Sequence, residues 1–96
     1  MGATTFTTVA EGRSAKDAFR AAVDEARHEH GNGGYTGTIA EKRSFNLYSF
    51  PDGTSPFDHA NKLLDQEDGP VADKWGPAGC FYIGSNKYLF FGWAST

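Results

Sequence analysis

Apolar and polar positions follow two different periods along this 96-residue chain. The β-branched run at residues 4–10 is typical of a strand, and Glu11-Gly12 behind it indicates a turn. Apolar residues then recur at helical spacing, which predicts a helix over residues 15–30. Ser14 followed by Asp17 is close to a capping box at the start of this helix.

The middle of the chain holds two β-rich runs, residues 35–41 and 45–50, separated by the charged pair Lys42-Arg43. This arrangement indicates a hairpin. Ser55-Pro56 then combines an N-cap with proline at the first helical position, which predicts a short helix ending around Gln66. The expected buried side of that helix consists of Phe57, Ala60, Leu63 and Leu64.

The last third of the chain predicts an irregular loop at residues 67–79 and a terminal hairpin built from residues 80–83 and 88–93. The order β-α-β-β-α-β-β over residues 1–96 indicates one α+β domain. We expect a two-layer sandwich with an antiparallel or mixed sheet. In its simplest form it is a ferredoxin-like variant with both helices on one face.

This architecture predicts an uncovered sheet face. The strands place large residues on both of their sides, yet helices on one face can cover only one side. Exposed apolar patches beyond a few hundred Å² are rare in monomers. We therefore expect a partner subunit, a target protein or a ligand to cover the second face.

Composition and charge narrow the class of protein. Aromatic residues reach 15%, and the formal charge is −3 with nine scattered Lys and Arg residues, so nucleic acid is an unexpected partner. The lone Cys80 excludes an intramolecular disulfide. No apolar run approaches the roughly 20 residues of a membrane span, and no signal sequence is visible, so we expect a cytoplasmic protein.

The glycine-rich stretch from His30 to Lys42 invites comparison with a phosphate loop. Phosphate loops precede a helix, whereas these glycines follow one, so residues 31–34 fit helix termination better. Gly37 differs because glycine inside a strand often marks a bulge or a close approach of a ligand. Its neighbours Tyr35, Thr36 and Thr38 would supply hydroxyl groups to a small ligand.

Other candidate chemistry is weak. His28 and His30 point about 200° apart on a helix and do not form a metal pair, so we expect no metal site. Cys80 begins an apolar strand and is more typical of a buried small hydrophobe than of a nucleophile. The acidic residues at 65–73 are typical of a solvated loop, with an acidic partner-binding patch as the alternative. We expect no catalytic residues and no cofactor.

An aromatic sheet also suggests RNA-recognition domains, which stack bases on strand aromatics. Phe6, Tyr48 and Phe50 are candidates for comparable places, but the run FNLYSF lacks the glycine and the basic residue of the usual motif. Core or dimer packing explains these aromatics better.

Two segments, GGYTGTIAEK at 33–42 and DKWGPAG at 73–79, stand behind a helix containing AFRAAVDEA. In these segments the chain resembles small proteins of unassigned role from bacteriophages of actinobacteria. The resemblance implies a phage-encoded protein that binds a host or defence component in the host cytoplasm.

The sequence therefore favours a small non-enzymatic binding protein. Its expected surface is an aromatic sheet face with Tyr48, Trp75 and Trp93, directed at a protein partner or at a second copy in a homodimer. The alternative is a protein that sequesters a small molecule or nucleotide. The residues expected to bind that ligand are Tyr35, Thr36, Gly37, Thr38 and Lys42.

Overall fold

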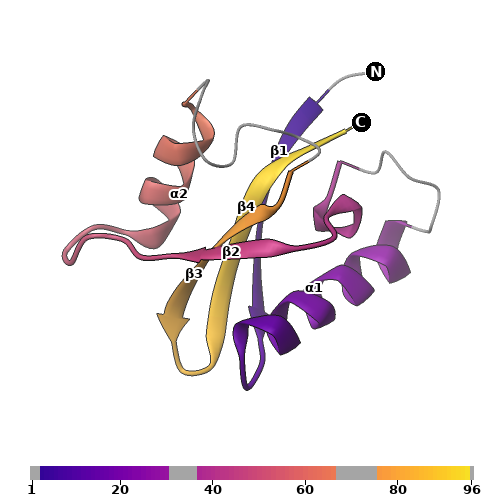
Figure 1. Ribbon diagram of the computed structural model, residues 1–96, viewed down its shortest axis with the longest axis horizontal. Helices are drawn as coiled ribbons and strands as arrows, with labels where there is room; N and C mark the ends of the chain where they lie inside the picture. The colour runs from indigo at the N-terminus through magenta and orange to yellow at the C-terminus, as the bar shows by residue number, and fades with distance from the viewer. Residues whose placement is uncertain (1–2, 31–36, 67–75, 96) are drawn as a thin grey trace.

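A computed structural model describes residues 3–30, 37–66 and 76–95 of the chain. Within these residues one mixed sheet has the strand order β1-β4-β3-β2 (Figure 1). The strands are β1 (Ala3–Glu11), β2 (Phe45–Tyr48), β3 (Ala78–Gly84) and β4 (Lys87–Ser95). β4 pairs antiparallel with both β1 and β3, whereas β2 pairs parallel with β3.

The predicted helices are confirmed. α1 spans Ala15–His30, and its first turn is capped because the Ser14 hydroxyl accepts a hydrogen bond from Asp17 N at 3.2 Å. α2 spans Pro56–Leu64 with Ser55 at the N-cap position, although the Ser55 side chain makes no cap hydrogen bond. Both starts follow from local sequence, which is why they could be predicted.

The terminal hairpin is also confirmed, with strands longer than expected. Ser85 and Asn86 connect β3 to β4, and both have positive φ, 54° and 61°. A two-residue turn of this kind matches the twist of the paired strands. Gly84, with φ 95°, accompanies a register irregularity just before the turn.

The predicted hairpin at residues 35–50 is wrong. Residues 35 and 36 lie outside the described residues, and the rest of the first run forms a 3-10 turn, η1 (Ile39–Glu41), in place of a strand. Thr38 caps this turn, and its side chain accepts a hydrogen bond from Ala40 N at 3.2 Å. β2 pairs instead with β3, because the α2 connection allows the two strands to run parallel.

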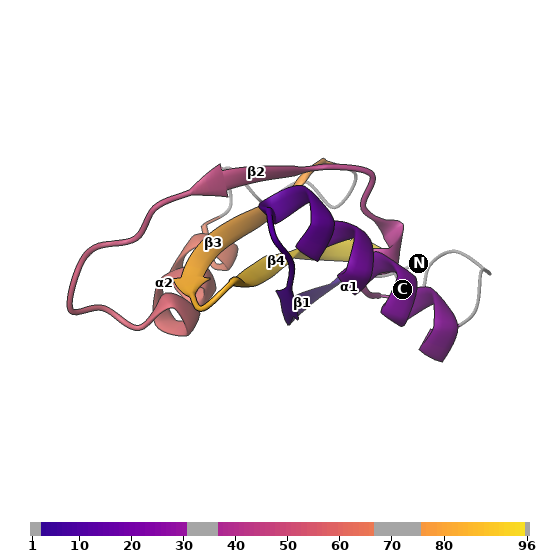
Figure 2. The ribbon, with the colours of Figure 1, turned by 90° about the horizontal axis from the view of Figure 1, so that it is seen from below.

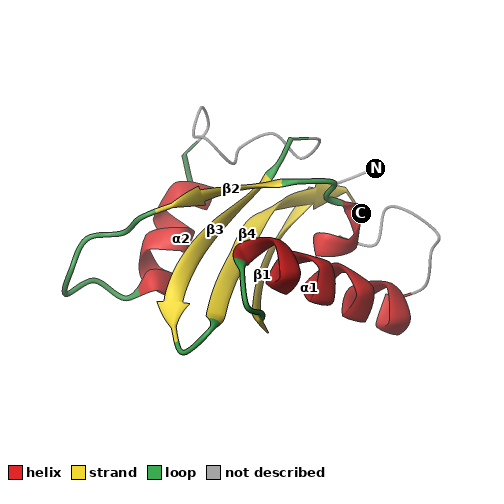
Figure 3. Ribbon diagram, turned by 60° about the horizontal axis from the view of Figure 1, so that its bottom comes forward, coloured by secondary structure: helices red, strands yellow, loops and turns green. Residues whose placement is uncertain are grey.

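The α+β class and most of the element order are confirmed, but the two helices cover opposite faces of the sheet. Neighbouring residues of a strand lie on opposite faces of the sheet. Cys80 and Phe90 accordingly pack in one core cluster, and Phe81 and Phe91 pack in the other. α1 lies over the first cluster and α2 over the second. Figures 2 and 3 show the two helices on opposite sides of the sheet. The expectation of both helices on one face was therefore wrong.

The α2 side of the sheet carries one of the two apolar clusters. Phe81, Leu89 and Phe91 are fully buried there beneath Ala60 and Leu64 of α2. The buried stripe of α2 is shifted from the predicted one, because Phe57 is exposed and the His59 ring lies 5.6 Å from the Phe81 ring. A large part of the face expected to be bare is therefore covered by the chain itself.

On the α1 side, the helix approaches the sheet through small residues. Ala18, Ala22 and Ala26 bring α1 close to β1 and β4, and Ile39 of η1 fills the space beside them. Because η1 packs against α1, the segment between η1 and β2 runs beside the helix. This juxtaposition creates the site described next.

Candidate functional site

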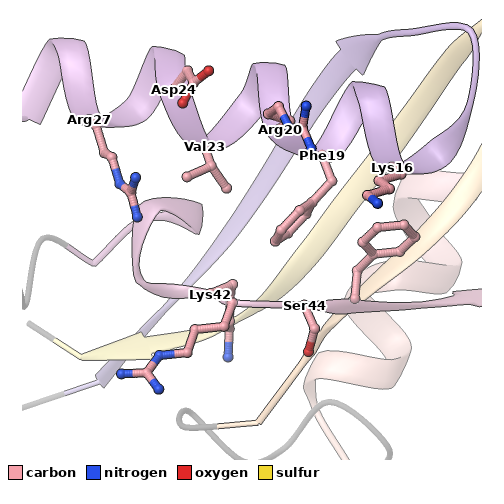
Figure 4. Close-up of a pocket in the computed structure, with 10 residues that line it drawn as sticks. Lys16, Phe19, Arg20, Val23, Asp24, Arg27, Lys42 and Ser44 are labelled. Atoms are coloured by element: carbon pink, nitrogen blue, oxygen red, sulfur yellow. The ribbon is translucent and has the colours of Figure 1, made fainter.

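A cleft of about 600 Å³ lies between α1 and the segment that joins η1 to β2. One wall comes from α1 and the other from residues 42–45, as Figure 4 shows. The volume is within the roughly 300–1,000 Å³ typical of small-molecule sites. The lining residues are Lys16, Phe19, Arg20, Val23, Asp24, Arg27, Lys42, Arg43, Ser44 and Phe45.

Positive charge is concentrated in this cleft. Five of the nine Lys and Arg residues line it, in a chain whose net charge is −3, and Asp24 is the single carboxylate among the lining residues in the described part of the chain. Four of these cations are exposed, and within the described residues none of the four forms an ion pair. The cleft is therefore an electropositive site on an acidic protein, and such a field attracts anions.

The apolar part of the cleft is an ordered aromatic group. The rings of Phe19 and Phe45 lie 5.0 Å apart, and both contact the fully buried Phe90, at 5.5 Å and 5.6 Å. Phe19 and Phe45 are only partly buried. The cleft thus offers aromatic surface whose position is fixed from below by Phe90.

Lys42 holds the second wall in place. Its side chain is only 4% exposed, and Nζ donates a hydrogen bond to the carbonyl oxygen of Gly76 at 2.9 Å. Its Cε lies above Gly92 of β4, beside the Phe6 ring. Lys42 therefore fixes the segment that carries Arg43.

Four of the eight residues expected to bind a ligand or partner belong to the stretch from Tyr35 to Thr38. Tyr35 and Thr36 lie outside the described residues, as does Trp75 of the partner-binding set. Gly37 has φ 73° just before the η1 cap, so its requirement for glycine has a local conformational cause. Thr38 is the cap itself, which gives its hydroxyl a structural role.

The other two aromatic candidates lie on the opposite side of the sheet from Lys42. Tyr48 packs against the α2 cluster. Trp93 also packs there, and its indole Nε1 donates a hydrogen bond to the Leu64 carbonyl oxygen at 3.0 Å. The structure therefore does not bring the described members of the expected set together at one place.

Cys80 is separated from His59 by the sheet. The thiol is fully buried among the α1-side core residues, whereas the His59 ring stacks near Phe81 on the α2 side. Burial raises the pKa of Cys80 from 9.0 to about 12, so the sulfur stays protonated at neutral pH. Only a thiolate is an effective nucleophile, and Cys80 is a core residue, as its position in an apolar strand predicted.

Sequence reasoning missed the cleft because it judged charge by clustering along the chain. Lys16, Arg20 and Arg27 lie within about 40° of one another around a helix with 3.6 residues per turn, so a basic stripe on α1 was detectable. The facing pair Lys42-Arg43 was visible only as a predicted hairpin tip. No local pattern indicates that the stripe and this pair face each other.

Neither helix in the described part of the chain is long and apolar enough to cross a membrane. Among residues 3–30, 37–66 and 76–95, no three His, Cys, Asp or Glu side chains group together in a way that could hold a metal ion. No protein family, curated protein or solved structure matches this chain.

Proposed function

We propose that the chain is a non-enzymatic binding protein that takes a phosphate-bearing small molecule in the cleft between α1 and residues 42–45. One observation carries this proposal: five of the nine Lys and Arg residues line one cleft in a protein of net charge −3. This is the small-molecule alternative indicated by the sequence, moved from the stretch at residues 35–38 to the cleft lined by Lys42.

The types of the cations favour phosphate as the anion. Arg20 and Arg27 come from α1, and Arg43 comes from the opposite wall. The planar guanidinium group donates parallel hydrogen bonds that match phosphate oxygens, and Arg is enriched where phosphate is recognised. In Figure 4 the Arg27 side chain extends from α1 toward the segment that carries Lys42. Both walls of the cleft therefore carry guanidinium groups.

A thermal-shift experiment with inorganic triphosphate tests this proposal. Saturation at 100 times Kd adds about 2.7 kcal/mol to the free energy of unfolding. In a domain of this size, 1 kcal/mol raises Tm by about 4–8 °C. Sodium chloride at equal ionic strength controls for general screening of charge. We expect triphosphate to raise Tm by several degrees and the chloride control to leave it almost unchanged.

Two variants with the same charge change locate the effect. Arg27→Gln with Arg43→Gln removes two exposed cations from the cleft, whereas Arg13→Gln with Lys62→Gln removes two exposed cations elsewhere. We expect the first pair to abolish the triphosphate shift and the second to retain it. An equal shift in both variants, or none in the wild type, would contradict the proposal.

A protein partner or a second copy of the chain is the second candidate, favoured by exposed apolar side chains. Leu47 is 58% exposed and Tyr82 is 50% exposed. Both lie on the α1 side, since Leu47 pairs with Cys80 and Tyr82 is two residues further along the same strand. Light scattering that gives a dimer mass in the wild type and a monomer mass for Leu47→Lys would support self-association. A monomer mass in both would remove the homodimer.

The setting of this binding is also a proposal. The resemblance to small actinobacteriophage proteins implies that the ligand or partner is met in the cytoplasm of an infected host. Co-purification of the tagged chain from host cells, followed by mass spectrometry of bound small molecules and proteins, tests the setting and separates the two candidates. Recovery of a phosphorylated compound favours the cleft, whereas recovery of one stoichiometric protein favours the exposed apolar side chains.

A further inference from the structure

We infer that the cleft recognises a nucleotide, with an aromatic base held beside Phe19 and Phe45 and the phosphates held at the Arg27 and Arg43 end. This inference rests on the proposed function and adds the chemical class of the ligand. It depends on the positions of the cleft residues along α1, because the aromatic rings lie toward one end of the cleft and Arg27 toward the other.

The two ends of the cleft differ. Lys16 and Phe19 belong to the first turns of α1, and Arg27 lies 11 residues beyond Lys16, which corresponds to roughly 16 Å along a helix axis. Figure 4 shows Phe19 and Lys16 toward one end and Arg27 toward the other. Val23 lies between them as an apolar wall. A compact inorganic anion would occupy only one end of such a cleft.

The aromatic end is suited to a flat ring. Phe19 and Phe45 keep part of their surface exposed, while the buried Phe90 ring supports both. Aromatic rings held in one orientation stack on bases with little selectivity, because every base presents a π-face. Lys16 and Arg20 beside these rings add cation–π donors that can also contact a base.

The phosphate end supplies charge without a competing partner. Arg27 and Arg43 are exposed, and no ion pair engages either of them within the described residues. The buried Lys42 fixes the wall on which Arg43 stands through its hydrogen bond to Gly76. Preorganised donors of this kind reduce the cost of binding an anion. A nucleotide with its base at one end and its phosphates at the other would contact residues along the whole cleft.

Calorimetric titration of the full chain with ATP, inorganic triphosphate and adenosine tests this inference. One base–aromatic contact supplies a preference of at least about fivefold. We therefore expect ATP to bind at least about fivefold more tightly than triphosphate, and adenosine more weakly than either. ATP binding no tighter than triphosphate would overturn the inference and leave the proposed function standing. Absence of binding by all three would overturn both.

Substitutions that remove an aromatic ring test whether the preference for ATP over triphosphate comes from the cleft. Phe45→Leu keeps an apolar side chain but removes the ring, and Phe57→Leu makes the same change at an exposed position on α2. We expect Phe45→Leu to reduce ATP affinity to the level of triphosphate without changing triphosphate affinity, and Phe57→Leu to change neither. An unchanged ATP preference in Phe45→Leu would contradict the inference.

A measurement on the unaltered protein remains decisive if the ring variant fails to fold. Saturation-transfer NMR reports which ligand protons lie close to protein protons. We expect the adenine protons of ATP to receive more saturation than the ribose protons, because the base lies against Phe19 and Phe45. Equal or weaker saturation of the base would overturn the inference.

Discussion

The two faces of the sheet use their side chains differently. On the α2 side, Phe81, Leu89 and Phe91 are fully buried under a nine-residue helix. On the α1 side, the helix packs through alanines, and a cleft remains between it and residues 42–45. Most of the large apolar side chains are thus used in the folded core. The Lys and Arg residues are scattered along the sequence, but five of them line the cleft, so charge that is grouped in space indicates the candidate site better than aromatic content does.

Among the substitutions that test this difference between the two faces, Phe81→Ala is expected to cause the largest loss of stability. Phe81 is fully buried and contacts the rings of Phe50, His59 and Phe91. Truncating a buried phenylalanine costs about 3–5 kcal/mol, through lost burial and the cavity that remains. Urea unfolding of this variant should show that loss, whereas Arg27→Gln on the α1 side should change stability by less than about 0.5 kcal/mol. Similar losses in the two variants would break the distinction between a packing face and a binding face.

A smaller effect is expected from Gly79→Ala. A Cβ at this position would collide with the Phe91 ring, which lies directly over the glycine on the α2 side. Added volume in a packed core costs about 1–3 kcal/mol. Thermal unfolding should show this loss, while triphosphate binding by the folded variant stays unchanged because the change lies on the face opposite the cleft. A neutral substitution would mean that the α2 side is loosely packed.

The pH dependence of stability tests the burial of Cys80 in the core beneath α1. The Cys80 thiol ionises near pH 9.0 when unfolded, but burial raises its pKa to about 12 in the folded state. Stability from this group is complete below pH 9 and falls as the pH rises toward 12, by about 1.4 kcal/mol per pH unit. Urea unfolding at a series of pH values should therefore show a steeper decline above pH 9 in the wild type than in Cys80→Ala. Equal slopes would indicate that water reaches Cys80.

Local features of the fold could be predicted from the sequence, whereas features that depend on distant partners could not. The period of α1 and its Ser14 cap lie within one segment, and the helix begins and ends as predicted. The parallel pairing of β2 with β3 and the side taken by α2 depend on contacts between segments. Local propensity also failed at Ile39, because burial beneath α1 and the Thr38 cap favour a 3-10 turn over a strand.

The candidate site also has features that the sequence predicts and features that it does not. The basic stripe of α1 follows from the helical spacing of its Lys and Arg residues, and the sequence also indicates Lys42 as a ligand residue. Its burial and its hydrogen bond to Gly76 depend on residues 34 positions apart. The cleft exists only because η1 turns the chain beside α1, and a predicted strand at that position conceals it.

The most direct test of the α1-side cleft is a residue-resolved NMR titration with inorganic triphosphate on the ¹⁵N-labelled full chain. We expect the amide shifts to concentrate in two segments, residues 16–27 of α1 and residues 42–45, with little change in α2. Shifts centred on α2, or spread equally over both helices, would contradict the assignment of binding to the α1 side of the sheet.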